Sequence, residues 1–433
     1  MLNVAIVGSG PAGYYTAEAL QKSFGADARI DIIDRLPTPF GLIRSGVAPD
    51  HQSLKAVSRR YEKTALSDEV RFVGNLPVGE GGISIAELSS LYDAVVLATG
   101  APHDRSLGLP GENLRGVLGS AEFVGWYNGH PDFVAVDPPL DQATAIIIGN
   151  GNVAIDCARI LAKTPDELSS SDIAAHAAER LATSRIRHIH ILGRRGPHQV
   201  SFTPKELGEM GQLARAAAIA DPAHFPPLEA DEDLEPGTRK VVGFLRDFAG
   251  SRIPKDVTVS FDFFQRPVRV EGSGRVERVE LERTELGTDG RAVGTGELTT
   301  LDCGLVISAI GYRTSPIAGV PFDEGRGVFE NRDGRISPGL YCVGWARRGP
   351  TGTIGTNKPD GYHVAELLQA DLQGAGGKAG RAGLDALIEA RGLDIVRFSE
   401  WQNIDAAEIA RARIGSPREK FVQVEEMLDA AKS

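Results

Sequence analysis

Two glycine-rich segments in this chain have residue types and a spacing that suit a dinucleotide held through its pyrophosphate. The glycines of the first segment are Gly8, Gly10 and Gly13. An apolar run at residues 4–7 precedes them, and a helix is expected to begin near Tyr14. The first glycine permits a tight turn, the second lets backbone approach a pyrophosphate, and the third allows close helix packing. The helix N-terminus would offer free N–H groups and the positive end of its dipole to the phosphates.

An acidic residue stands about twenty positions beyond this segment, at the distance typical of a ribose ligand. The apolar run at residues 30–33 predicts a second strand, and it ends in Asp34. The glycines alone would be a weak signal, but a strand, glycines, a helix, a strand and an acid in register are specific. The first segment therefore predicts a site for FAD or a similar dinucleotide.

The second glycine-rich segment follows the apolar run at residues 145–148 and has a different ending. Gly149 and Gly151 are followed by Ala154, which is small enough for contact between helix and strand. The next apolar run ends not in an acid but in Arg194 and Arg195. An acid there would repel a 2′-phosphate, whereas guanidinium groups can bind it bidentately. This predicts NADP(H) at the second site; the alternative is a solvated arginine pair at a strand end.

Length, composition and charge limit the class of protein. A chain of 433 residues is long enough for two or three domains, each with a core. The net charge of −11 argues against general affinity for nucleic acids or anionic membranes. The apolar runs are of strand length, far short of the roughly 20 residues that span a bilayer. Because only three residues precede the first run, we expect no signal peptide and a cytoplasmic protein.

The cysteines give no sign of redox or metal chemistry. Cys157, Cys303 and Cys342 are widely spaced and form no CxxC pair. Three thiols cannot ligate a four-cysteine iron–sulfur cluster, and no other metal site is expected. Each cysteine stands in an apolar run, where we expect a small buried residue.

The order of the patterns predicts how the domains are arranged. The second glycine segment lies between two apolar strands that end in glycine turns, at residues 92–100 and 304–311. This predicts an α/β fold with two Rossmann-like dinucleotide-binding domains, one inserted into the other. We expect residues 1–105 and 313–433 to form the FAD-binding domain and residues 106–312 to form the NADP-binding domain.

Further patterns predict elements inside these domains. Alternating polarity from residue 257 to 300 predicts a β-meander in the second domain. A loop rich in Pro, Asp and Glu covers residues 221–237 and matches no motif that we can assign. A strand near residue 340 runs into a glycine-rich loop and then a helix at residues 360–370, whose start suits a phosphate or flavin contact. Helical periodicity at residues 384–432 predicts helices packed on the first domain.

Four of these stretches together carry a family resemblance. They are residues 39–51, residues 150–153, the pair Arg194–Arg195 and residues 345–352. In this order they resemble adrenodoxin reductase and its bacterial relatives, the adrenodoxin-reductase-like ferredoxin–NADP⁺ reductases, and the resemblance covers nearly the whole chain. It implies a glutathione-reductase-like architecture, with FAD in a discontinuous domain and NADP(H) in an inserted one. It also implies electron transfer between NADPH and a ferredoxin-type iron–sulfur protein.

The resemblance also implies which residues contact the cofactors. For FAD these are Ala12, Asp34, Leu42, Val78, Trp345, Gly352, Thr353 and Ile354. For NADP they are Asn150, Gly151, Asn152, Val153, Arg194, Arg195, Glu206 and Gly352. NADPH delivers a hydride and a ferredoxin accepts single electrons, and a flavin can join them because it is stable in one- and two-electron states. No amino-acid nucleophile is then needed.

Three side chains have both a functional and a structural interpretation. His51 could stabilise charge or relay a proton near the flavin, or it could hydrogen-bond Asp50 or backbone and shape its loop. Glu206 could bind the nicotinamide carboxamide or ribose, or it could stabilise a helix start. Trp345 could lie beside the flavin ring, or it could be a core residue. His51 and Glu206 are the candidate catalytic residues.

An acidic ferredoxin partner would need a local basic patch on a protein of charge −11. The candidate clusters are Arg239, Lys240 and Arg246; Lys55, Arg59 and Arg60; and Arg347 with Arg348. Any of them could instead be an ordinary solvated face. We expect a monomer. Two other functions use similar sites: an NADPH-dependent flavin monooxygenase, and a flavin electron-transfer subunit of a larger reductase.

Overall fold

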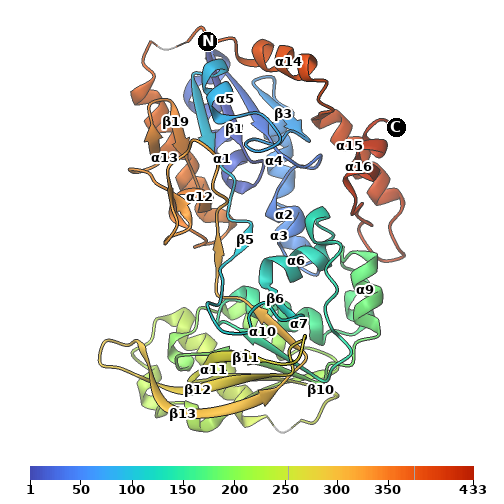
Figure 1. Ribbon diagram of the computed structural model, residues 1–433, viewed down its shortest axis with the longest axis vertical. Coiled ribbons are helices and arrows are strands. Elements are labelled where there is room, and N and C mark those ends of the chain that lie inside the picture. The colour runs from blue at the N-terminus through green and yellow to red at the C-terminus, as the bar shows by residue number, and fades with distance from the viewer. Residues whose placement is uncertain (252, 375) are drawn as a thin grey trace. The chain divides into compact units, whose positions relative to one another are not determined.

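The computed structural model describes residues 1–251, 253–374 and 376–433, which divide into two compact units (Figure 1). The first unit contains residues 1–103, 128–131 and 312–433, and the second contains residues 104–127 and 132–311. The second unit is therefore formed by two stretches of chain that interrupt the first. Each unit is built on its own parallel sheet.

A mostly parallel sheet forms the centre of the first unit. Its strands are β1 (Leu2–Val7), β2 (Ala28–Ile33), β3 (Val70–Gly74), β4 (Ala94–Leu97), β18 (Arg335–Ser337), β19 (Leu340–Cys342) and β20 (Val396–Arg397). They lie in the order β18-β19-β4-β1-β2-β3-β20, with β18 and β20 antiparallel to their neighbours. The helical periodicity of the C-terminal region gave no sign of β20. The short strands outside this sheet are β15 (Tyr312–Arg313), β16 (Phe322–Asp323) and β17 (Val328–Phe329).

Helices cover both faces of this sheet. They are α1 (Pro11–Phe24), α2 (Leu42–Ser45), α3 (Gln52–Lys55), α4 (Ser58–Ala65), α5 (Ile85–Leu91), α12 (Trp345–Arg348), α13 (Asn357–Asp371), α14 (Gly380–Arg391), α15 (Phe398–Ala410) and α16 (Val424–Ala431), with the 3₁₀ turns η1 (Gly25–Asp27) and η6 (Ile354–Thr356). Helix α1 begins at Pro11, earlier than the expected Tyr14, because proline is well suited to a first helical turn. Helix α13 packs closely on α1, since a Cβ at Gly361 would lie 2.7 Å from the backbone nitrogen of Thr16.

The two faces of the first sheet have separate cores. Val4 and Ile6 belong to the core that includes α1 and α13, whereas Ala5 and Val7 belong to the core that includes α5 and α14. Successive strand side chains point to opposite faces, so a strand covered on both sides is apolar along its whole length. This packing fixes the carboxyl end of β1, from which the first glycine segment begins.

The second unit contains a parallel sheet and an antiparallel one. The parallel strands are β6 (Val117–Gly119), β7 (Thr144–Ile148), β8 (His188–Gly193), β9 (Ala216–Ala220), β10 (Val257–Phe263) and β14 (Leu305–Ser308), in the order β6-β14-β7-β8-β10-β9. The antiparallel strands are β11 (Gln265–Glu271), β12 (Arg278–Leu286) and β13 (Ala292–Asp302). The strand β5 (His103–Asp104) spans the point at which the chain leaves the first unit.

The predicted β-meander was wrong in one part. β10 does not belong to it, because it pairs in parallel with β8 and β9 inside the main sheet. Its alternating polarity arises because Val259 and Phe261 face the main core, whereas Ser260 and Asp262 point to the half-buried opposite face. An alternating pattern predicts a strand, but it carries no information about which strands become its neighbours.

Helices and 3₁₀ turns surround the second unit's sheet. They are α6 (Ser120–Asn128), α7 (Asn152–Ala162), α8 (Pro165–Leu168), α9 (Ala175–Ala182), α10 (Pro204–Met210), α11 (Pro236–Gly250), η2 (Pro131–Phe133), η3 (Pro197–Gln199), η4 (Pro222–His224) and η5 (Leu228–Asp231). Residues 128–131, at the end of α6 and the start of η2, belong to the first unit. In the described residues no helix is both long and apolar enough to cross a membrane.

The cysteines are buried, as predicted, and none of the three forms a disulfide. Burial raises the pKa of the Cys303 thiol and that of the Cys342 thiol, each to about 12. Burial likewise raises the pKa of Cys157. Because the thiolate is the reactive form, all three residues act as small apolar side chains at neutral pH.

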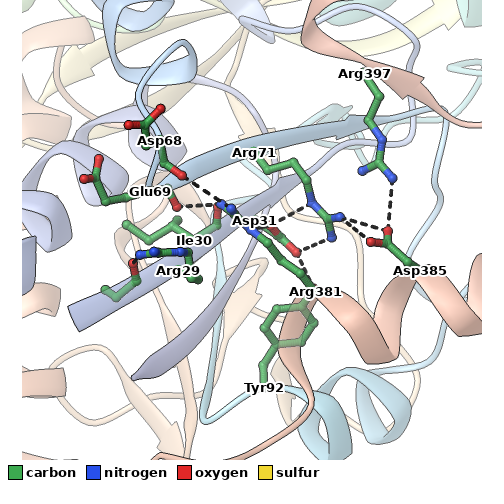
Figure 2. Close-up of polar contacts among 11 residues, drawn as sticks. Arg29, Ile30, Asp31, Asp68, Glu69, Arg71, Tyr92, Arg381, Asp385 and Arg397 are labelled. Atoms are coloured by element: carbon green, nitrogen blue, oxygen red, sulfur yellow. Dashed lines mark hydrogen bonds and ion pairs between the residues drawn. The ribbon is translucent and has the colours of Figure 1, made fainter. Parts of the chain in front are cut away.

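A largely buried ion-pair network attaches helix α14 to the sheet of the first unit (Figure 2). Asp31 on β2 is completely buried, and Arg71 on β3 and Arg381 on α14 lie 2.6 and 2.9 Å from its carboxylate. The Tyr92 hydroxyl is a third partner and donates a hydrogen bond of 2.5 Å to it. Arg71 also pairs with Asp385 of α14 at 2.8 Å. Three side chains therefore fix the position of β2 at Asp31, three residues before Asp34.

Candidate functional site

The first glycine segment forms the turn between β1 and α1, and each glycine has a different environment. Gly8 has a φ of +111°, and a Cβ there would lie 2.4 Å from the carbonyl oxygen of Ala98. A Cβ at Gly13 would lie 2.1 Å from the Gly8 oxygen. Gly10 differs, because its φ is −78° and no atom lies within 4 Å of its Cβ position. The space above Gly10, at the N-terminus of α1, is therefore open to a ligand.

Asp34 follows directly after β2, and its carboxylate is held by groups of Ser9 and Leu36. One carboxylate oxygen accepts hydrogen bonds from the Ser9 N–H at 2.9 Å and from the Ser9 hydroxyl at 2.5 Å. The other accepts one from the Leu36 N–H at 3.0 Å. Asp34 also lines a small pocket whose wall contains Thr38, Arg44 and residues 128–131. The acid therefore lies beside both the glycine turn and a cavity.

Two other loops meet the first glycine segment. The Phe40 N–H donates a hydrogen bond to the Ser9 oxygen at 3.0 Å, and Phe40 has a φ of +82°, which is uncommon for a residue with a side chain. Gly41 is so close that a Cβ there would lie 3.0 Å from the Gly10 Cα. From the other loop, a Cβ at Gly344 would lie 2.7 Å from the Ala12 side chain. Residues far apart in sequence thus converge at the start of α1.

The remaining predicted FAD contacts lie in this unit. Trp345 begins α12, stacks on Tyr312 with ring centroids 6.1 Å apart, and donates its Nε1–H to the Thr351 oxygen at 3.1 Å. Three further predicted contacts, Gly352, Thr353 and Ile354, lie between α12 and α13. The other two, Leu42 and Val78, lie elsewhere in the first unit. Gly352 has a φ of +82°, Thr353 precedes η6, Ile354 begins it, Leu42 begins α2, and Val78 forms an isolated bridge with Ile83. Their contacts with FAD stay predictions.

The second glycine segment repeats the geometry of the first. A Cβ at Gly149 would lie 2.3 Å from the oxygen of Ala309, and Ala154 is completely buried against the sheet. Gly151 has a φ of −119° and nothing within 4 Å of its Cβ position. The N-terminus of α7 is therefore open to a ligand, as that of α1 is. Val153 is half-buried in its first turn.

Two asparagines beside Gly151 have structural contacts that the sequence did not reveal. The side-chain oxygen of Asn152 accepts a hydrogen bond of 2.8 Å from the Thr203 N–H, which fixes the segment entering α10. The Asn150 side chain occupies the space where a Cβ of Gly193 would lie, with its nitrogen 1.8 Å away. Asn150 therefore explains why β8 ends in glycine.

Glu206 and His51 lie in different units. Glu206 is buried in the first turn of α10, where its carboxylate is 3.8 Å from the guanidinium of Arg159, a completely buried residue of α7. Asp156 lies 2.7 Å from the same guanidinium. His51 is 7% exposed in the first unit and precedes α3. Glu206 thus lies where an acid that stabilises a helix start is expected, and it also has Arg159 as a charged partner. The catalytic role of both residues stays a prediction.

Arg194 and Arg195 are exposed at the carboxyl end of β8, and their backbone is firmly held. The Arg194 oxygen accepts a hydrogen bond of 2.8 Å from the buried hydroxyl of Thr284, and the Arg195 oxygen accepts one of 3.3 Å from the Phe264 N–H. The Arg195 guanidinium donates to the Gln199 oxygen at 3.3 Å. An exposed cationic pair on an ordered backbone suits phosphate recognition.

The structure buries one member of the predicted basic clusters and gives several others a hydrogen-bond or ion-pair partner. Lys55 is buried, and Arg60 pairs with Glu18 at 2.7 Å. Arg348 pairs with Asp360 at 2.8 Å.

In the remaining cluster Arg246 pairs with the Asp231 carboxylate at 2.7 Å, and Arg239 donates to the backbone oxygen of Asp231 at 3.1 Å. Lys240, Arg59 and Arg347 complete the clusters; Lys240 and Arg59 are exposed, and Arg347 lies 3.0 Å from Asp333.

Known proteins share this arrangement. Residues 2–189 match the family described as pyridine nucleotide-disulphide oxidoreductase. The NADPH-ferredoxin reductase FprA of Mycobacterium leprae is 42% identical over 446 residues, which cover 98% of this chain and 97% of that protein. The human mitochondrial NADPH:adrenodoxin oxidoreductase is 42% identical over 449 residues, covering 98% of this chain and 91% of that protein. The chain belongs to the family of NADPH–ferredoxin and adrenodoxin reductases.

A solved structure agrees with this assignment. Mycobacterium tuberculosis FprA in complex with NADPH has a TM-score of 0.95 and 41% sequence identity, and the match covers 100% of both chains. The predicted resemblance, the α/β fold and the oxidoreductase class are therefore confirmed. This chain is an oxidoreductase of the ferredoxin–NADP⁺ reductase type.

Proposed function

We propose that this reductase passes electrons from NADPH, bound at the second unit, through FAD, bound at the first, to a ferredoxin-type iron–sulfur protein. The main support is that Gly10 and Gly151 stand where the protein itself does not require glycine. Both have a φ that any residue adopts and open space at Cβ. A phosphate group lying against the backbone does require glycine at such a position.

The residues around each glycine fit the two dinucleotides. At the first site Asp34 is oriented by backbone N–H groups, so that it can accept a ribose hydroxyl. At the second site Arg194 and Arg195 supply the positive charge that a 2′-phosphate needs. The helix N-termini of α1 and α7 contribute N–H donors for the pyrophosphates. FAD, when bound, connects a hydride donor with a one-electron acceptor.

Replacing Gly10 with alanine is expected to abolish tight FAD binding without unfolding the protein. The wild-type protein should purify yellow, with one FAD per chain that acid precipitation releases. In the Gly10→Ala variant the new methyl group meets no protein atom within 4 Å, so the apo fold should form normally. The methyl occupies the space of the pyrophosphate, and we expect FAD affinity to fall by a factor on the order of a hundred, the loss of about two charge-assisted hydrogen bonds.

FAD content after gel filtration and far-UV circular dichroism measure the two effects separately. Gly237→Ala is the matched control, because that glycine also has nothing within 4 Å of its Cβ position but lies in the first turn of α11. A Gly10→Ala protein that keeps its FAD would show that the first site has been misassigned. A colourless wild-type protein that takes up no FAD would contradict the proposed cofactor itself.

The rate of electron transfer to an acidic ferredoxin is expected to fall as the salt concentration rises, whereas the rate of reduction of a small neutral dye should stay the same. Exposed charges are screened over about 8 Å at 0.15 M salt, which suppresses docking but not hydride transfer within a covered site. Charge reversal at the docking surface should therefore slow ferredoxin reduction several-fold and leave dye reduction unchanged. Lys240→Glu and Arg59→Glu are the first variants to test, because both side chains are exposed.

Arg239 is less suitable for that test, since its guanidinium supports the backbone of residues 231–234. Equal loss of ferredoxin and dye reduction would mean that the replaced residue supports folding or cofactor binding. Salt-independent ferredoxin reduction would refute electrostatic docking.

Ferredoxin-dependent cytochrome c reduction, compared with substrate-dependent oxygen consumption, separates this function from that of a flavin monooxygenase.

A further inference from the structure

The structure suggests a role for the acidic loop, which we define as residues 221–235. Sequence patterns assign it no function, and most of its acidic side chains are exposed. Asp231 is different, because only 7% of it is exposed. A carboxylate is buried in a loop only where specific partners compensate for the water it loses. Those partners indicate what the loop does.

Asp231 joins two elements of the second unit. One carboxylate oxygen lies 2.8 Å from Nε2 of His198, which belongs to η3, three residues after Arg195. The other lies 2.7 Å from Nε of Arg246, on α11, and helix α11 packs against η3. The hydrogen bond from Arg246, and then that from His198, hold the pKa of Asp231 below its ordinary value. The carboxylate therefore stays ionised at neutral pH and keeps both partners.

The acidic loop also reaches the same turn by a second route. The ring of His224 packs against that of Phe264 with centroids 5.8 Å apart. Phe264 has a φ of +57°, and its N–H donates to the oxygen of Arg195. A residue with a side chain keeps such a backbone only where its surroundings enforce it. The loop therefore supports the arginine turn, residues 194–199, through both His198 and Phe264.

We propose that Asp231 is a positioning residue for NADP(H), because it holds His198 and Arg246 together and so fixes the arginine turn that receives the 2′-phosphate. This inference rests on the proposed function of Arg194 and Arg195. A carboxylate repels a phosphate, so Asp231 can favour binding only through its partners. An ordered turn favours binding because less conformational freedom is lost when the ligand arrives.

The test compares ligands that differ only in the 2′-phosphate. Binding of adenosine 2′,5′-bisphosphate and of AMP to the FAD-loaded enzyme is measured by titration calorimetry, for the wild type and for Asp231→Ala. We expect the variant to bind the bisphosphate about tenfold more weakly and AMP equally well, since the lost order concerns two long side chains. KM for NADPH should rise by a similar factor, with kcat and the NADH constants unchanged.

Two sets of variants separate positioning from charge and from folding. Asp233→Ala removes the same charge from an exposed position of the loop, and by electrostatics alone it should leave bisphosphate binding unchanged or slightly tighter. His198→Gln keeps an N–H donor and should bind like the wild type, whereas His198→Ala should reproduce the Asp231→Ala result.

Unchanged bisphosphate affinity in Asp231→Ala would overturn the proposal. An equal loss of bisphosphate and AMP affinity would do the same, because the loop would then support the whole unit and not the 2′-phosphate contact. The binding measurement requires no electron transfer, so failure of the proposed ferredoxin reductase function would leave it interpretable. A wild type that binds AMP and the bisphosphate equally would instead refute the 2′-phosphate site itself.

Discussion

Replacing Arg194 and Arg195 together with alanine is expected to remove most of the preference of this reductase for NADPH over NADH. Each charge-assisted contact with a phosphate contributes about 1.5–3 kcal/mol, so losing both should reduce selectivity on the order of a hundredfold or more. The loss should fall mainly on KM for NADPH and leave NADH turnover little changed. Steady-state kinetics with both nucleotides measures the ratio directly.

The matched control is the double variant Arg185→Ala with Arg187→Ala. These arginines are also exposed, but they precede β8, whereas Arg194 and Arg195 follow it. The strand's six residues separate the two pairs. If the Arg194 and Arg195 variant keeps the wild-type ratio, or if the control loses as much, the assignment of the 2′-phosphate site is wrong.

Replacing Asp31 with asparagine is expected to destabilise the first unit by about 3–5 kcal/mol, the usual cost of breaking a buried ion pair. The amide is nearly the same size as the carboxylate, so the core should not develop a cavity. The guanidinium groups of Arg71 and Arg381, however, lose the charge that compensates for their burial. The change should lower the midpoint of urea unfolding, followed by circular dichroism and by release of the flavin.

Asp385 provides the control within the same network (Figure 2). Its side chain is 47% exposed, although Arg71 lies 2.8 Å from its carboxylate. Water can solvate the groups that remain, so Asp385→Asn should cost about 1 kcal/mol or less. Similar small losses in both variants would show that burial does not strengthen the network. A large loss of stability in the Asp385→Asn variant alone would show that α14 is held mainly by its exposed ion pairs.

The two glycine turns that we propose as the dinucleotide sites were predictable from the sequence because their determinants are local. Gly8, Gly10 and Gly13 lie within one turn, and Asp34 follows on the next strand. The same holds for Gly149 and Gly151 with the arginine pair that ends β8. A turn's steric demands and a strand end's charge are properties of short segments, and the period of apolar residues places both on their elements.

Surface charge was not predictable, because exposure depends on residues that are distant in sequence. Lys55 reads as a surface lysine, yet it is buried and donates to the Asn128 side chain at 3.3 Å. Arg246 reads as a docking residue, yet Asp231 has already neutralised it. The charge of a side chain is known from its residue type, but its ion-pair partners are set by the tertiary contacts between loops and helices.

The two glycine turns, the acid beside one and the arginines beside the other follow from neighbouring residues, so the amino-acid sequence alone was enough to locate them. The strand partners, as for β10, and the compensated charges, as for Asp31 and Asp231, were set by the three-dimensional packing of the chain. Strand pairing and ion pairing join groups tens to hundreds of residues apart, so a local pattern of polarity is compatible with many such pairings.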